Sequence, residues 1–375
     1  PLDHAGEDQL VVTIPEGASS GPITVVGSEP GEISNSLQFS VLAPDEGGSL
    51  TDIGSFRSFG EPEYAALLAV ASHGRLVAVG GEDGYLYLFD SDPASPGYQE
   101  FASPVDLASG PMAGLAISAD GTTVYAAGTD SPAIRVVDGN PANETFGEIV
   151  RNLPVGGEGL GSLAVNPAGS HLLAADNYES VLHLVEMATG EVTEIPVPGG
   201  TVVGIAIHPA GRHAYLALAG DDPADLAVVD LVEGSEGFGQ IMAQVNLPDG
   251  DPDPIPVGLS FTPDGHTLYV LTSLLSGPPG RAVMSIDVTD PGAPGPPVLQ
   301  ADIVSAALPV SEDLKVSPDG GRLVLNVSGE GIYQAGLDPF SLGAAPEVPL
   351  GEGELALAFA PDASRLYAAD AANDM

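Results

Sequence analysis

Seven copies of one short pattern recur along this chain, and their recurrence constrains the fold more than any single residue does. Each copy reads apolar, small, apolar, polar, then a Pro-Asp-Gly or similar turn, then a second apolar strand. The turn glycines, with Ala363 in the seventh slot, lie 42 to 55 residues apart. This spacing is typical of one four-stranded sheet per repeat, as in the blades of a β-propeller. The copies begin at Leu68, Leu115, Leu163, Ile205, Leu259, Leu314 and Leu357.

Large and small side chains alternate along the first strand of each copy. In the second copy Leu115 and Ile117 face one side and Ala116 the other, because successive side chains of a strand point in opposite directions. Opposed large and small faces let radially arranged sheets interdigitate without voids. We therefore expect an all-β fold, a seven-bladed β-propeller with this strand innermost in each blade.

Charge limits the partners of this chain, since 52 Asp and Glu stand against 9 Lys and Arg and give a formal net charge of −43. Such a surface repels phosphate backbones and anionic lipids, so we expect no nucleic acid partner and no membrane insertion of this segment. The absence of cysteine removes disulfide, thiol and Cys-zinc chemistry. This composition fits an exported protein, and we expect an extracellular or cell-surface location.

The repeats resemble the surface-layer or YVTN-type family of β-propellers, whose units read apolar-Ala-apolar-Ser-Pro-Asp-Gly before a Leu-Tyr-Val-Ala strand. The copy LSFTPDGHTLYVLT, from Leu259 to Thr272, carries the pattern clearly, and the resemblance covers Tyr64 to Met375. It implies the propeller fold. It implies no single activity, because relatives serve as surface, adhesive, binding and enzymatic modules.

A different pattern precedes the repeats, between Gln9 and Leu42. It resembles the C-terminal half of an IPT/TIG immunoglobulin-like domain, which implies an N-terminal β-sandwich fragment. The expected domains are residues 1–43 for this fragment, 44–62 for a linker and propeller-closing strand, and 63–375 for the propeller. The matching residues are Pro15, Gly17, Gly21, Pro22, Ser34, Asn35, Leu37, Phe39 and Val41.

The last repeat is incomplete, because the sequence stops after its second strand. Closing a propeller needs strands from elsewhere, commonly from the other terminus. We expect the segment Leu50 to Phe59 to supply the outer strand. The third strand is expected either beyond Met375 or from a neighbouring molecule, which indicates an excerpt from a longer chain of extracellular modules.

One acidic loop is a candidate metal site. Asp249, Asp251 and Asp253 alternate there, and clustered carboxylates with backbone carbonyls supply the oxygen ligands that Ca²⁺ takes. The EF-hand pattern is not met, because Pro254 stands where a glycine is required. Two interpretations remain, a Ca²⁺ site or a solvated acidic loop. No other cofactor is expected.

The residue just before the turn is polar in five repeats. Innermost strands line the axial channel of a propeller, so these side chains form a channel polar ring that could hold water, a metal ion or a small ligand. Polar packing around water is the alternative. The ring consists of Ser118, Asn166, His208, Thr262 and Ser317.

Basic and imidazole side chains also follow the turns. Repeat symmetry spreads them around the ring, so we expect each to pair with an acid of its own turn or an adjacent one, and a shared catalytic cluster is the alternative. Lys315, the only lysine, is expected in a buried ion pair with Asp313 or an acid of the next blade, with anion binding as an alternative. Asn143 begins an Asn-Glu-Thr glycosylation acceptor pattern. The turn residues concerned are His171, His213, His266, Arg322 and Arg365.

These features favour a non-enzymatic structural or adhesive module of a cell surface, sheath or filament. Its propeller rims would contact protein subunits or surface glycans, and it could assemble as a homo-oligomer or filament. The competing hypothesis is a hydrolase similar to the lactonase propellers. That hypothesis requires His208, Asn166 and nearby loop acids, such as Asp130 or Glu158, to converge at the channel mouth with a metal ion or a His/Arg/Glu cluster. A sugar- or peptide-binding propeller is a third hypothesis.

Overall fold

The computed structural model describes most of the repeat region and parts of the N-terminal region. The described residues are 2–5, 10–12, 38–44, 50–57, 65–71, 74–81, 83–91, 104–176, 178–198, 200–220, 225–248, 255–273, 280–304, 313–327, 330–343, 348–349 and 355–370. Within these ranges all regular elements are β-strands, which confirms the predicted all-β fold. The same ranges contain no helix with the length and apolarity needed to span a bilayer.

The strands pair antiparallel with their sequence neighbours in successive sheets, which we number in chain order. Sheet 1 contains β5 (Ala65–Val70), β6 (Leu76–Gly81), β7 (Tyr85–Asp90) and β8 (Val105–Asp106). Sheet 2 contains β9 (Met112–Ile117), β10 (Thr123–Gly128), β11 (Ala133–Asp138) and β12 (Ile149–Pro154). Sheet 3 contains β13 (Leu160–Val165), β14 (His171–Asp176), β15 (Val181–Glu186) and β16 (Val192–Pro196).

The later repeats continue this order. Sheet 4 contains β17 (Thr201–Ile207), β18 (His213–Ala219), β19 (Leu226–Asp230) and β20 (Ile241–Val245). Sheet 5 contains β21 (Ile255–Phe261), β22 (Thr267–Ser273), β23 (Gly280–Asp287) and β24 (Val298–Val304). Sheet 6 contains β25 (Leu314–Val316), β26 (Arg322–Val327), β27 (Gly331–Leu337), β28 (Phe340–Leu342) and β29 (Val348–Pro349).

One further sheet, the closing sheet, joins the two ends of the repeat region. It runs in the order β30 (Leu355–Phe359), β31 (Leu366–Asp370), β3 (Gln38–Pro44) and β4 (Leu50–Arg57). The expectation of a third strand from outside this sequence is wrong, because β3 pairs with β31. β3 lies inside the range 1–43 that we assigned to the immunoglobulin-like fragment. The expected outer strand is β4, paired with β3.

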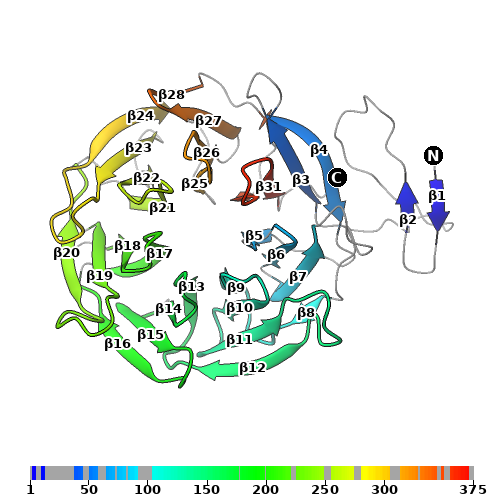
Figure 1. The fold of residues 1–375 in the computed structure, drawn as a ribbon, viewed down its shortest axis with the longest axis horizontal. Helices are drawn as coiled ribbons and strands as arrows, with labels where there is room; N and C mark the ends of the chain where they lie inside the picture. The colour runs from blue at the N-terminus through cyan, green and yellow to red at the C-terminus, as the bar shows by residue number, and fades with distance from the viewer. Residues whose placement is uncertain are drawn as a thin grey trace.

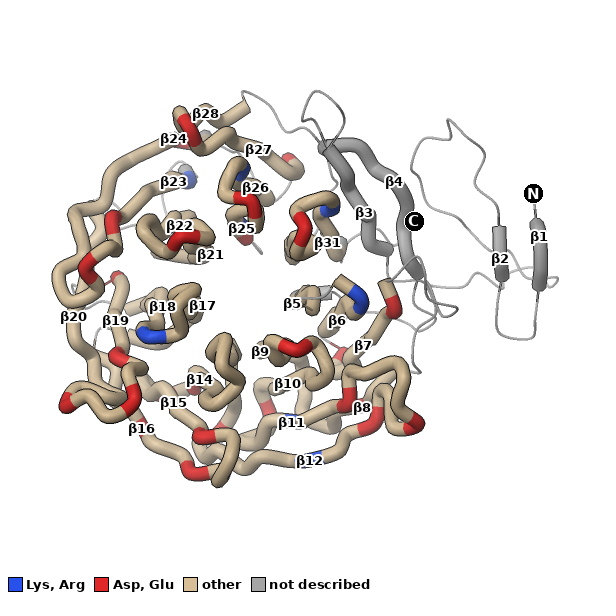
Figure 2. Tube along the Cα trace, viewed as in Figure 1, with Lys and Arg blue, Asp and Glu red and all other residues tan. Residues whose placement is uncertain are grey.

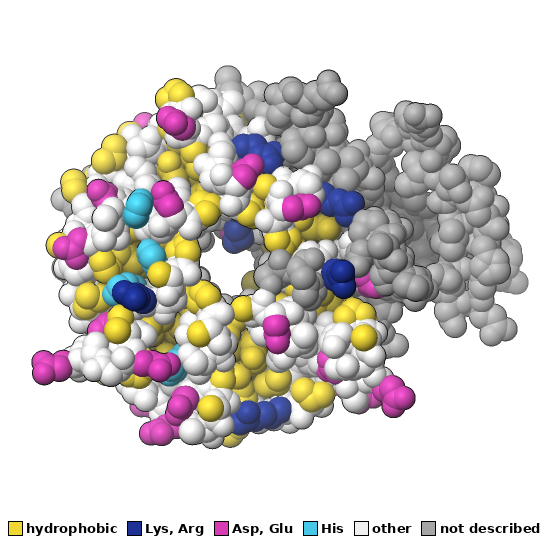
Figure 3. Space-filling model, viewed as in Figure 1, with side chains coloured by type: hydrophobic (Ala, Val, Ile, Leu, Met, Phe, Trp, Pro, Cys, Tyr) yellow, Lys and Arg dark blue, Asp and Glu magenta, His cyan; other side chains and the backbone are white. Residues whose placement is uncertain are grey.

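The sheets are arranged radially around a central opening (Figure 1). Strands β5, β9, β13, β17, β21 and β25 lie nearest the axis, and β8, β12, β16, β20, β24 and β28 lie at the rim. The opening persists when side chains are drawn (Figure 3). Two short strands, β1 (Leu2–Ala5) and β2 (Leu10–Val12), form a separate pair.

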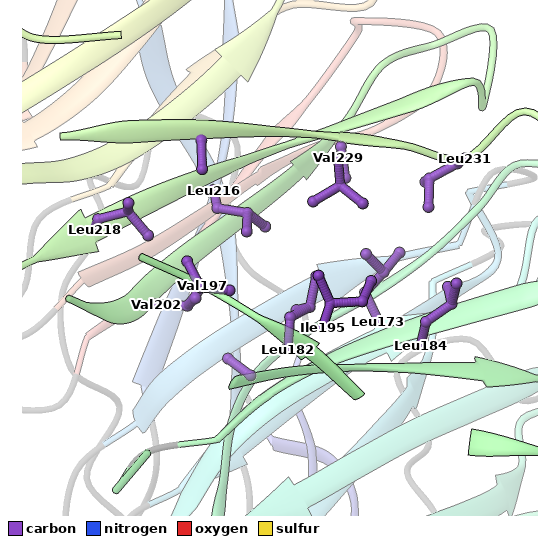
Figure 4. Close-up of a cluster of buried hydrophobic side chains, with 13 residues drawn as sticks. Leu173, Leu182, Leu184, Ile195, Val197, Val202, Leu216, Leu218, Val229 and Leu231 are labelled. Atoms are coloured by element: carbon purple, nitrogen blue, oxygen red, sulfur yellow. The ribbon is translucent and has the colours of Figure 1, made fainter. Parts of the chain in front are cut away.

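The core consists of apolar clusters between neighbouring sheets. Leu173 and Leu182 of sheet 3 pack against Leu216 and Val229 of sheet 4 in the cluster shown in Figure 4. The two faces of β9 behave as predicted, since Leu115 packs toward sheet 1 and Ala116 toward sheet 3. Fully burying one such large side chain stabilises the fold by about 1.5–3 kcal/mol, so the sheet interfaces hold the ring together.

Candidate functional site

The turns that follow the innermost strands lie on one face of the ring, which we call the turn face. Each innermost strand ends there and each second strand begins there. Acidic residues occupy the turns from β9 to β10, β21 to β22 and β25 to β26 (Figure 2). The turns of sheets 2 to 6 and of the closing sheet are the segments 118–122, 166–170, 208–212, 262–266, 317–321 and 360–364, the last of which contains Asp362.

Three members of the channel polar ring brace their own turns through a hydroxyl group. Ser118 Oγ donates to Asp120 Oδ1 at 2.6 Å and accepts from the Thr123 backbone N–H at 3.0 Å. Thr262 forms the same two bonds, with Asp264 and the Thr267 N–H, and Ser317 forms them with Asp319 and the Arg322 N–H. The repeated geometry makes each hydroxyl a structural part of the turn.

These bonds stabilise the ionised turn aspartates. The hydroxyl of Ser118 holds the pKa of Asp120 below its ordinary value, and a backbone N–H adds to the effect. The hydroxyl groups of Thr262 and Ser317 lower the pKa of Asp264 and Asp319 in the same way. The aspartates of these turns therefore remain charged and bonded at neutral pH.

The other two ring members use different atoms to brace the turn. Asn166 Oδ1 accepts from the His171 N–H at 3.1 Å, and its Nδ2 donates to Ser170 Oγ at 3.0 Å. His208 Nδ1 accepts from the Ala210 N–H at 3.0 Å. All five predicted ring residues thus bond to protein atoms, and each supports the turn of its own sheet.

Proline and glycine link the turns of neighbouring sheets. A Cβ atom at Gly211 would lie 3.1 Å from Cδ of Pro167, so the turn of sheet 4 rests against the turn proline of sheet 3. The same contact joins Gly320 of sheet 6 to Pro263 of sheet 5. Glycine is suited to such close approach because it has no side chain. These contacts lie on the turn face and connect repeats that the core also connects.

The imidazole and guanidinium groups after the turns are dispersed around the ring. His266 Nδ1 lies 3.4 Å from Asp264 Oδ2, and His171 Nδ1 lies 3.5 Å from Glu233 Oε1. Arg322 Nη2 donates to the backbone carbonyl of Ala363 at 2.8 Å, and the charge of Arg322 helps to lower the pKa of Asp319 in its own turn. Each of these groups thus has a partner in its own or a neighbouring sheet.

Lys315 and Asp313 form the predicted ion pair at the inner edge of sheet 6. Lys315 Nζ lies 2.7 Å from Asp313 Oδ1. The predicted burial is wrong, because 36% of the Lys315 side chain is exposed. Asp313 also accepts the backbone N–H groups of Leu314 and Leu357, so its carboxylate joins sheet 6 to the closing sheet.

A buried His–Asp pair that the sequence analysis did not single out lies at the opposite end of sheet 3. His183 Nε2 is 3.8 Å from Asp176 Oδ2, and their side chains are 2% and 1% exposed. These two atoms and His183 Nδ1 have no hydrogen-bond partner in the part of the chain that the structure describes. Gly157 covers the pair closely, since a Cβ there would lie 1.9 Å from Asp176 Oδ2. The only signal in the sequence is a histidine inside an apolar strand.

The remaining predicted sites are a metal loop and a glycosylation acceptor. Asp249, Asp251 and Asp253 lie outside the described residues, and the described part of the chain contains no group of three or more possible metal-binding His, Asp or Glu side chains. Asn143 lies in the exposed loop between β11 and β12, where its Nδ2 donates to Asp138 Oδ2 at 2.9 Å.

The residues of the lactonase-like hypothesis lie at opposite ends of the strands. Asn166 and His208 belong to the turn face. Asp130 follows the far end of β10, and Glu158 precedes β13, whose Leu160 pairs with Asp176 at the far end of β14. A six-residue strand is about 20 Å long, so these four side chains do not converge.

Comparisons with known proteins show the fold. No protein-family model matches the sequence, and no curated protein matches it. Kuenenia stuttgartiensis hydrazine synthase is similar in structure, with a TM-score of 0.65 at 13% identity over 82% of this chain and 93% of that one. The Cps50 (Swd1) β-propeller domain of Myceliophteria thermophila has a TM-score of 0.58 at 16% identity, over 81% and 96% of the two chains. With the radial sheets, this likeness identifies the chain as a β-propeller.

Proposed function

We propose that this chain is a non-enzymatic structural or adhesive module of an extracellular protein. Its core is a closed seven-bladed β-propeller of the YVTN or surface-layer type, with sheets 1 to 6 and the closing sheet as blades. One contact supports closure, since a Cβ at Gly74 of sheet 1 would lie 3.3 Å from Cδ of Pro361 in the closing sheet. The IPT/TIG-like segment of this proposal is residues 1–43, and β3 forms its last part.

One observation carries the proposal: the polar side chains of the turn face are bonded to groups of their own or a neighbouring blade. A catalytic site needs groups that converge on one point and remain available to a substrate. The hydroxyl groups of Ser118, Thr262 and Ser317 instead repeat one turn-bracing geometry. Repetition of this geometry in several turns favours a rigid disc whose rims bind other molecules.

The rims would bind protein subunits or surface glycans. The net charge of −43 disfavours anionic partners and close self-association at low ionic strength. We infer that contacts form in high salt or through Ca²⁺, for which the loop with Asp249, Asp251 and Asp253 is the proposed site.

The test uses the whole chain on a glycan array and in a lactone-hydrolysis assay, each with added Ca²⁺ or with a chelator. We expect no lactone turnover in either condition, and glycan binding that the chelator abolishes. An Asp251→Asn variant should lose the Ca²⁺-dependent binding, whereas Glu194→Gln, on the outer strand β16, should retain it.

One result would overturn the proposal, and a second would overturn only its Ca²⁺-dependent part. Lactone hydrolysis that disappears in a His208→Ala variant would establish the competing hydrolase hypothesis. Glycan binding that is unaffected by the chelator and by Asp251→Asn would remove the role of Ca²⁺ while leaving adhesion in place.

A further inference from the structure

One contact between sheets on the turn face differs from the others in its chemistry. At three other interfaces a turn proline packs against the turn glycine of the next sheet, as Pro167 does against Gly211. Between sheets 4 and 5 the imidazole of His208 occupies that place. A Cβ at Gly265 would lie 2.3 Å from His208 Nε2. An ionisable ring is therefore the nearest neighbour of this turn glycine, whereas Gly74, Gly211 and Gly320 have a proline ring there, and we call this contact the His208 seam.

The hydrogen bonds at the His208 seam require a neutral imidazole. His208 Nδ1 accepts from the Ala210 backbone N–H at 3.0 Å, so Nδ1 carries no proton. His208 Nε2 lies 3.0 Å from the carbonyl oxygen of Gly265, so Nε2 must donate. Protonating Nδ1 would place its N–H opposite the Ala210 N–H, and two donors cannot form a hydrogen bond. The bond to Ala210 would then be lost.

Aromatic packing holds the ring in this position. The His208 ring meets Phe261 of sheet 5 edge-on, with centroids 5.4 Å apart, and Phe261 in turn packs on Tyr215 at 5.2 Å. Tyr215 is fully buried. The imidazole is thus held, half-buried, between sheets 4 and 5.

Other titratable groups lie around the seam, and they include both acids and bases. The His213 ring lies 6.3 Å from the His208 ring, and burial lowers the pKa of His213, although Asp230 opposes this effect. A proton on either ring would repel a proton on the other. The charged groups that face the seam are His213 and Arg212 from the start of β18, Asp230 from the end of β19, and Asp264 and His266 from the turn of sheet 5.

We propose that the His208 seam is an acid-operated joint, which is closed while the imidazole is neutral and opens between sheets 4 and 5 when it is protonated. Histidine is the side chain that commonly changes charge between about pH 8 and about pH 5. The joint would loosen the turn face locally in mild acid, while the other proline–glycine contacts keep the ring intact.

Hydrogen exchange on the full chain tests the joint, followed by mass spectrometry at about pH 7.5 and about pH 5 and corrected for intrinsic exchange rates. We expect the turns 208–213 and 262–267 to lose protection by about tenfold at the lower pH, the effect of losing one hydrogen bond. His208→Asn should remove the pH response, because Asn166 braces the corresponding turn of sheet 3 without ionising. His266→Asn is the matched control and should respond as the unaltered chain does.

Either of two results would overturn the proposal: equal protection at both pH values in the unaltered chain, or an undiminished response in His208→Asn. Nitrogen-15 NMR of the ring gives a check that does not depend on variants. The spectrum at about pH 7.5 should show the Nε2–H tautomer of His208, and an Nδ1–H tautomer would contradict the inferred bonding.

Discussion

Asp313 Oδ2 accepts the backbone N–H of Leu357 at 3.1 Å, and this bond joins sheet 6 to the closing sheet. The other carboxylate oxygen holds Lys315 and the Leu314 N–H. Blade contacts in this molecule thus combine apolar packing with a few directed bonds between inner strands. A second example is Ser260 Oγ, which accepts the Val316 N–H at 2.9 Å across sheets 5 and 6.

Removing the Asp313 carboxylate should destabilise the propeller more than removing its lysine partner. Asp313→Ala leaves two backbone N–H groups without their acceptor, at a cost of about 1–3 kcal/mol. Lys315→Ala breaks a partly exposed ion pair, which is worth about 0–1 kcal/mol. Urea denaturation of both variants measures the two losses. Equal losses would mean that the ion pair, not the backbone bonding, carries the contribution of Asp313.

Two matched glycine substitutions separate the energy of a proline–glycine contact from the energy of backbone strain. Gly169 and Gly211 have φ of +68° and +70° in equivalent turns, but a Cβ at Gly169 meets no described atom within 4 Å, whereas one at Gly211 meets Pro167. Gly169→Ala should cost about 1–2 kcal/mol through strain alone. Gly211→Ala should cost about 1 kcal/mol more through overpacking. Thermal unfolding tests the difference, which should disappear in a Pro167→Ala background.

The turn aspartates predict a loss of stability in acid. Hydrogen bonds lower the pKa of Asp120, Asp264 and Asp319 below 3.8 in the folded chain. The unfolded chain therefore binds protons first as the pH falls. Their contribution is complete above the unfolded value and disappears as the pH falls through the lowered folded values. Melting temperatures measured from about pH 6 to about pH 2.5 should fall most steeply below about pH 4.

Single substitutions measure how much of the loss of stability in acid comes from Asp120. Asp120→Asn should flatten the dependence of melting temperature on pH in this range, because one linked proton is removed. Ser118→Ala should have a similar effect, since the Ser118 hydroxyl is the largest cause of the lowered pKa of Asp120. An unchanged slope in both variants would show that other acids dominate the response.

The sequence predicts the inner architecture well because its signals are local. Period-two alternation at Leu115 and Ala116 identified the faces of the innermost strand, and both contacts are as expected. The turn bracing could also have been predicted, since Ser118 and Asp120 stand two residues apart and the same spacing recurs in other repeats.

The closing strand could not be predicted in the same way. Gln38 pairs with Asp370, and no local pattern connects segments so far apart in the chain. The pattern around Phe39 and Val41 fits a strand of either kind of sheet, so its place depends on the unpaired edge that β31 offers. The His183–Asp176 pair was missed for a related reason, because its environment comes from the separate loop around Gly157.

The buried pair in sheet 3 gives the last prediction. Asp176 Oδ1 accepts the N–H groups of Tyr178 and Glu179 at 2.7 and 2.8 Å, whereas both ring nitrogens of His183 lack a partner within the described residues. Asp176→Ala should therefore cost about 1–3 kcal/mol. His183→Phe should be nearly neutral or stabilising, because it removes unsatisfied buried polar atoms at similar volume.

The denaturant midpoints of Asp176→Ala and His183→Phe show whether Asp176 alone stabilises this part of sheet 3 or whether His183 also contributes. Gly157→Ala provides the control for the covering loop and should be strongly destabilising, since its Cβ would overlap Asp176 Oδ2 and its φ is +80°. If His183→Phe instead costs as much as Asp176→Ala, the imidazole must have a bonded partner in solution, such as a buried water between the two side chains. The hydrogen-bonding role assigned here to Asp176 alone would then extend to both residues.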